Sequence, residues 1–127
     1  MQSPEINWER IAASHPDHRA AGEATLCAVY PDARNPFTHT SLLHEEALEA
    51  WSVHDVWVMS AGQGTNRWID VTDTFPRKLD ALRAHESQTS HMEDLEGMLR
   101  GWLSANAVAG GLGEDRLAES FRVVTVP

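Results

Sequence analysis

The chain contains 127 residues, of which 42% are hydrophobic and 23% are charged, and this composition is typical of one folded domain with a modest core. The formal net charge is -9 and the ten Lys and Arg residues are scattered, so a nucleic-acid partner is not expected. No apolar run approaches the roughly 20 residues of a membrane span. The first residues do not resemble a secretory signal, so we expect a cytoplasmic protein.

The first predicted helix runs from Asp17 or His18 to about Tyr30, and Pro31 ends it. Its predicted N-cap is Ser14 or Asp17, because hydroxyl and carboxylate oxygens accept hydrogen bonds from the free amides of a first turn. The side chains expected on its buried side are Leu26, Val29 and Tyr30.

Two strands are predicted in the middle of the chain. A loop with Asn35 and Pro36 leads to a short helical stretch over residues 43–48, which Trp51 closes. The apolar runs 56–59 and 68–71 are short, β-branched and aromatic, and this is typical of strands. The segment Ala-Gly-Gln-Gly at 61–64 predicts the turn between them.

Two further helices and a strand follow. The first helix starts near Asp73 or Thr74, tolerates Pro76 in its first turn, and carries an apolar stripe that His85 continues. The stripe consists of Phe75, Leu79 and Leu82. Residues 90–93 match a capping box for a second helix that Gly110 and Gly111 end. Its expected apolar face consists of Met92, Leu95, Leu99 and Trp102. Residues 121–124 predict a last strand, and the alternation favours a layered α/β fold.

Several polarizable side chains are expected in the core. Cys27 is the single cysteine, which excludes an internal disulfide, and its apolar neighbours predict a buried thiol. Three of the five tryptophans are expected to pack in the core rather than to stack on a sugar; these are Trp57, Trp68 and Trp102. Trp8 and Trp51 fit either role.

Residues 15–18 read His-Pro-Asp-His, just ahead of the first predicted helix. Two imidazoles and a carboxylate at a proline-fixed helix start can bind a metal ion, move a proton or cap the helix. The spacing alone leaves these three roles open. A catalytic zinc ion takes three protein ligands, and the other histidines show no paired metal spacing.

Three blocks carry a resemblance to a known family: SHPDHRAAGEATLCAVYPDARNPF, then RKLDALRAHESQ, then LAESFRVV. In this order they resemble the carboxyl-terminal part of the LmbE-like deacetylases, the GlcNAc-PI de-N-acetylase (PIG-L) family, from about Ser3 to Val124. The resemblance implies a zinc-dependent N-deacetylase with a Rossmann-like layered α/β/α fold. Its expected substrate is an N-acetylated amino sugar of the N-acetylglucosamine type. It also implies that His18 is a zinc ligand, that His15 stabilises the oxyanion or protonates the leaving amine, and that Asp17 orients His15.

The sequence departs from the family in one respect. The family has an amino-terminal block of the form AHPDDE, which supplies the other zinc ligands and the general base, and this sequence contains no such block. We therefore expect residues 1–127 to be a single partial domain that lacks the amino-terminal strands and supplies part of the site. Such a chain is expected to be inactive alone, and either to self-associate or to be completed by another chain.

Two questions stay open at this point. The alternative to a deacetylase is a non-catalytic remnant or interaction module that keeps the His-Pro-Asp-His block without its chemistry. The residues His85, Ser87 and Gln88 in the second block are a family feature, and they either brace the site or line its pocket.

Overall fold

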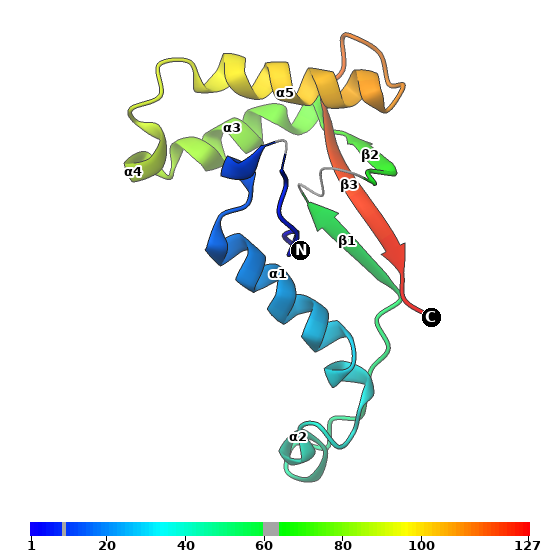
Figure 1. Cartoon of the computed structure of the whole chain (residues 1–127). Helices are drawn as coiled ribbons and strands as arrows, with labels where there is room; N and C mark the ends of the chain where they lie inside the picture. Colours follow the sequence, from blue (N-terminus) through cyan, green and yellow to red (C-terminus); the bar gives the residue numbers. More distant parts are fainter. Residues whose placement is uncertain (9, 60–63) are drawn as a thin grey trace. The chain divides into compact units, whose positions relative to one another are not determined.

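A computed structural model describes residues 1–8, 10–59 and 64–127 (Figure 1). The chain divides into two compact units. The first unit contains residues 1–66 and 121–127, and the second unit contains residues 67–120. Among the described residues, no helix is both long and apolar enough to cross a membrane.

The first unit is built on the strand pair β1 and β3. Its elements in chain order are η1 (Ile11–Ala13), α1 (Pro16–Val29), η2 (Asp32–Arg34), α2 (Thr40–His44), β1 (Asp55–Met59) and the greater part of β3 (Ala118–Thr125). β1 and β3 are antiparallel, in a register that pairs Asp55 with Thr125 and Met59 with Phe121. On the other edge of β1, Gln2 forms an isolated parallel bridge with Met59.

Helix α1 approaches the chain's first residues closely at a glycine. Gly22 is the buried residue of this helix, and a Cβ atom on it would lie 2.6 Å from the carbonyl oxygen of Gln2 and 2.9 Å from the nitrogen of Pro4. Nearby, Nε of Arg19 donates a hydrogen bond of 3.3 Å to the carbonyl of Pro4. Because the segment that contains Gln2 also pairs with β1, the glycine contact ties α1 to the strand pair.

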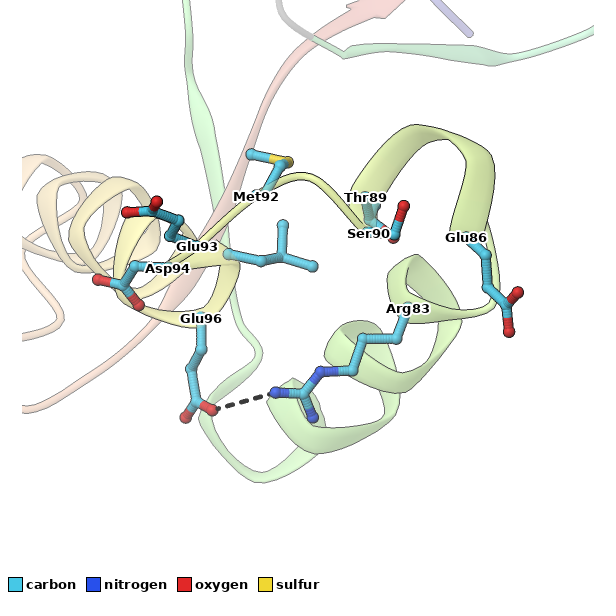
Figure 2. A pocket seen from close by; sticks show the side chains of 9 residues that line it. Arg83, Glu86, Thr89, Ser90, Met92, Glu93, Asp94 and Glu96 are labelled. Atoms are coloured by element: carbon cyan, nitrogen blue, oxygen red, sulfur yellow. Dashed lines mark ion pairs between the residues drawn. The ribbon is translucent and has the colours of Figure 1, made fainter.

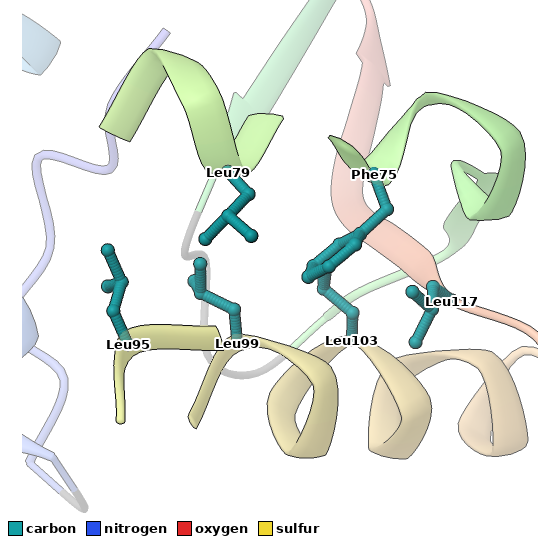
Figure 3. Close-up of a cluster of buried hydrophobic side chains, with 6 residues drawn as sticks. All are labelled: Phe75, Leu79, Leu95, Leu99, Leu103 and Leu117. Atoms are coloured by element: carbon teal, nitrogen blue, oxygen red, sulfur yellow. The ribbon is translucent and has the colours of Figure 1, made fainter. Parts of the chain in front are cut away.

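The second unit packs helices against each other around a leucine-rich core. Its elements are β2 (Arg67–Asp70), η3 (Thr72–Thr74), α3 (Phe75–Arg83), α4 (Glu86–Thr89) and α5 (Leu95–Ala109). Leucines on α5 recur every fourth residue and point toward α3 (Figure 3). The buried cluster consists of Phe75, Leu79, Leu95, Leu99, Leu103 and Leu117.

The main elements of the sequence prediction are confirmed. The chain is mixed α/β, and in the described residues the strands form a three-stranded sheet of order β1-β3-β2. The predicted strands at 56–59, 68–71 and 121–124 correspond to β1, β2 and β3, and Gly110 ends α5 as expected. Of the predicted turn 61–64, residues 61–63 lie outside the described residues.

Two predicted helix starts are wrong in detail. The short helix expected at 43–48 is α2, which begins at Thr40 and ends at His44, so Trp51 lies well beyond it. The capping box at 90–93 does not form, because Ser90 is the C-cap of α4 and Asp94 caps α5 instead. The carboxylate of Asp94 accepts the amide hydrogen of Gly97 at 2.8 Å.

Several burial predictions are also wrong. Cys27 is exposed, and of the residues expected on the inner side of α1, Leu26 and Tyr30 are 40% and 63% exposed. Trp57 and Trp102 are likewise exposed, whereas Trp68 is half-buried against Gly110. His85 does not extend the apolar stripe of α3, since it lies beyond that helix as the exposed N-cap of α4. The apolar pattern of the first unit is real, but α1 contributes only Gly22 to its buried residues.

Candidate functional site

The His-Pro-Asp-His block lies at the start of α1 in the first unit. Pro16 occupies the first turn, where its missing amide hydrogen costs nothing. The residue before the block is anchored, because Oγ of Ser14 accepts the amide hydrogen of Asn7 at 2.7 Å and its own amide donates to the carbonyl of Ile11 at 2.9 Å. The entry to the helix is therefore held by hydrogen bonds on both sides of η1.

His15, and neither Ser14 nor Asp17, caps the helix. Nδ1 of His15 accepts the amide hydrogen of Asp17 at 3.2 Å, so the predicted N-cap is wrong. A nitrogen that accepts a hydrogen bond carries no proton, and a neutral imidazole with a bare Nδ1 carries its proton on Nε2. The cap thus selects the tautomer that presents an N–H donor at the far edge of the ring.

The carboxylate of Asp17 lies beside the same imidazole without bonding to it. Its Oδ2 is 3.8 Å from Nδ1 of His15, and the Asp17 side chain is 88% exposed. This distance is too long for a hydrogen bond. In this arrangement the backbone amide of Asp17 orients His15, while the carboxylate adds negative charge at the helix start, where the helix dipole favours it.

His18 lies one turn further along the same face. Its ring centroid is 5.7 Å from that of His15, and the ring planes are inclined by 53°. Among the described residues, His18 makes no hydrogen bond or ion pair, so its imidazole nitrogens are open to a ligand.

The described residues do not by themselves fit a zinc site. In the part of the chain that the structure describes, no group of three or more His, Cys, Asp or Glu side chains is placed to hold a metal ion. The ring of His15 is 5.7 Å from that of His18, and its Nδ1 is engaged in the cap. His18 is therefore available as one ligand of a larger set.

The block with His85, Ser87 and Gln88 belongs to the second unit. All three side chains are exposed, and the carbonyl of His85 accepts the amide hydrogens of Gln88 and Thr89 at 2.9 and 3.1 Å. The backbone of this block thus forms the turn that starts α4. Its three side chains hold no partner among the described residues.

A polar hollow of about 450 Å³ lies beside α4 in the second unit (Figure 2). Its charged side chains include Arg83, Glu86, Glu93, Asp94 and Glu96. Glu96 pairs with Arg83 at 3.7 Å, and in Figure 2 the carboxylate of Glu86 lies far from those of Glu93 and Asp94. The hollow therefore lacks the convergent polar groups of a catalytic or metal site.

A second hollow, which the sequence prediction missed, lies in the first unit. It has a volume of about 420 Å³ and is lined mainly by apolar residues of η2, α2 and the segment that reaches Trp51. We call it the Trp51 pocket; its lining includes Asp32, His39, Leu42, Leu48, Glu49 and Trp51. The sequence feature that could have indicated this hollow is the group of leucines ahead of Trp51, a tryptophan for which the sequence left two roles open.

Comparison of the chain with known proteins identified no relative. No protein-family model, no curated protein and no solved structure matches the chain.

Proposed function

We propose that this chain supplies part of the catalytic site of a zinc-dependent N-deacetylase of the LmbE-like type, which acts on an N-acetylated amino sugar. The observation that carries the proposal is the tautomer of His15, because the cap on its Nδ1 leaves an exposed Nε2–H donor beside the open imidazole of His18. The resemblance of the three sequence blocks to that family supports the same function.

The chemistry of amide hydrolysis matches this donor. Attack of water on an amide carbonyl creates an oxyanion, and the amine that leaves must gain a proton. The Nε2–H group of His15 can donate a hydrogen bond to the oxyanion. Its position at the start of α1 adds the favourable field of the helix dipole for the developing negative charge.

We propose that His18 is one ligand of a zinc site whose other ligands lie outside these 127 residues. A catalytic zinc ion takes three protein ligands, and among the described residues no group of three His, Cys, Asp or Glu side chains is placed to hold one. The remaining ligands would come from an AHPDDE-type block. We also propose a Rossmann-like layered fold for the complete enzyme, on the resemblance of the three sequence blocks alone.

The test uses a longer chain that carries an AHPDDE-type block ahead of residue 1, assayed for release of acetate from N-acetylglucosamine derivatives. His18→Ala is expected to remove the zinc, as measured by elemental analysis. His15→Asn is expected to keep both the zinc and the helix, because Asn caps as well as a histidine does here. It should lower turnover by about 10² to 10³, the effect of losing an oxyanion donor.

Asp17→Asn separates capping from catalysis. The amide of residue 17 and its bond to His15 remain in this variant, so any loss of turnover measures the carboxylate. His91→Ala, an exposed histidine of the second unit, is the control and should change neither zinc nor turnover. If His15→Asn and His18→Ala both retain full zinc and full activity, the catalytic role is wrong and the non-catalytic module is the better description.

A further inference from the structure

The Trp51 pocket is an open hollow with walls that the backbone holds in place. The amide of Trp51 donates to the carbonyl of Ala33 at 2.7 Å, and the amide of Leu48 donates to the carbonyl of Leu42 at 2.9 Å. These bonds close the segment from η2 to Trp51 on itself. The volume of about 420 Å³ falls in the range of small-molecule sites, which are mostly apolar with a few polar groups.

The lining contains two carboxylates and neither Lys nor Arg. Asp32 and Glu49 line the pocket, and His39 lines it beside Asp32. The nearest basic residue in the sequence, Arg34, is engaged elsewhere, since its guanidinium donates to the carbonyl of Pro127 and lies over the ring of Tyr30. The ion-pair contact of Asp32 is with Nε2 of His39, at 3.9 Å. The pocket therefore disfavours an anion and favours a cation.

An aromatic face completes the lining. Trp51 is 71% exposed, so its indole can still bury area against a ligand, and indole is the best aromatic partner for an organic cation. Leu42 and Leu48, which are 41% and 54% exposed, add aliphatic walls for an apolar body.

We propose that the Trp51 pocket binds a small organic ammonium ion with an apolar body. Asp32 and Glu49 attract the charge, the indole of Trp51 stacks on the ligand, and the leucines cover its hydrocarbon part. The proposal does not rest on deacetylation. Ala28, which lines the pocket, is ten positions from His18 on the same helix, a separation of about 15 Å.

The experiment compares three ligands that share a phenyl group and differ in charge: phenethylamine, 2-phenylethanol and phenylacetate. Binding to the full chain is measured by isothermal titration calorimetry at low salt. Phenethylamine is expected to bind more tightly than 2-phenylethanol by about fivefold, the combined effect of an exposed cation–π contact and a surface ion pair. Phenylacetate should bind most weakly.

Two variants locate the binding. Asp32→Asn combined with Glu49→Gln should remove most of the preference for the amine while leaving the affinity for the alcohol nearly unchanged, a result that a misfolded variant would not produce. Trp51→Ala should weaken both ligands. The matched controls are Glu23→Gln on α1 and Trp8→Ala, which lie outside the pocket lining and should change neither affinity.

Three results would overturn the proposal. These are equal affinity for the three ligands, an amine preference that is undiminished in the Asp32→Asn, Glu49→Gln double variant, and the absence of amine binding at millimolar concentration. Binding of neutral N-acetylglucosamine at this pocket without binding of the amine would replace it with a sugar site. None of these results bears on acetate release by the longer chain, so the two proposals fail separately.

Discussion

Because Gly22 has no side chain, α1, which carries the candidate site, can lie against the first residues of the chain. Gly22→Ala would place a methyl group 2.6 Å from the backbone oxygen of Gln2, and backbone cannot rotate away as a side chain can. We expect this variant to lose more than about 1 kcal/mol of unfolding free energy, as overpacking does. Urea unfolding followed by circular dichroism measures it.

Gly101 on α5 is the matched control, because a Cβ atom there would meet nothing within 4 Å. Gly101→Ala should therefore stabilise the chain by about 0.5–1 kcal/mol, the ordinary gain of alanine over glycine inside a helix. Equal effects of the two substitutions would contradict the close approach of α1 to the first residues.

Asp70 makes the stability of the second unit depend on pH in the acidic range. Oδ1 of Asp70 accepts the hydroxyl and amide hydrogens of Thr72 at 2.7 and 2.9 Å, and Oδ2 is 2.8 Å from Nε of Arg116. The hydrogen bonds from Thr72, with the charge of Arg116, hold the pKa of Asp70 below its ordinary value. Since the folded pKa is lowered, the contribution is complete above the unfolded pKa of about 3.9. It is lost as the pH falls through the lower folded value.

Asp70→Asn is therefore expected to destabilise the chain at neutral pH, with a difference from the wild type that shrinks as the pH falls below that range. Urea unfolding at a series of pH values measures this. Asp73→Asn, at an exposed position nearby, should not alter the acid dependence. A constant difference between Asp70→Asn and wild type at every pH would show that the carboxylate charge is unimportant.

The start of α5 distinguishes two ways of capping the same helix. The sequence pattern favours Ser90, whereas the carboxylate of Asp94 accepts the amide hydrogen of Gly97. Asp94→Ala should cost about 1 kcal/mol of stability, Asp94→Asn should cost little, and Ser90→Ala should be nearly neutral. Thermal unfolding of the three variants orders them, and a large loss for Ser90→Ala would favour the capping box.

Periodicity explains why the elements were predictable and their ends were not. The leucines of α5 recur at helical spacing and β1 is a short β-branched run, so both follow from the sequence. Three neighbouring residues, Ser14, His15 and Asp17, can each cap α1, and only the backbone geometry decides among them. The tautomer of His15, on which the candidate site depends, was beyond sequence reasoning for that reason.

At the scale of the whole chain, the two units differ in how many hydrophobic side chains they bury. The described core residues cluster in the second unit, and in the first unit Val56 is the buried hydrophobic side chain among the described residues. A sequence pattern shows which side chains are apolar, but burial requires a second layer to cover them. The prediction of a buried face on α1 is wrong for this reason, since Tyr30 and Leu26 are exposed.

The exposed apolar side chains of the first unit predict self-association. Trp8, Ile11 and Phe37 are 79%, 68% and 82% exposed, and apolar surface of this kind tends to be covered by another molecule. Sedimentation velocity should show a rise in mean mass from micromolar to hundred-micromolar protein. Trp8→Ser with Phe37→Ser should reduce the rise, whereas Met98→Ser in the second unit should not. A concentration-independent monomer would contradict the prediction.

The position of β3 in the chain has a consequence for synthesis on the ribosome. The core of the second unit joins residues that all lie between Phe75 and Leu117, so its contacts can form while the nascent chain is still growing. The ladder of β1 instead joins Asp55 to Thr125, which are 70 residues apart, and such distant pairing is slow. A nascent chain that stops just before residue 121, held on the ribosome by a linker long enough to fill the exit tunnel, would therefore carry a folded second unit and a β1 strand that lacks its antiparallel partner.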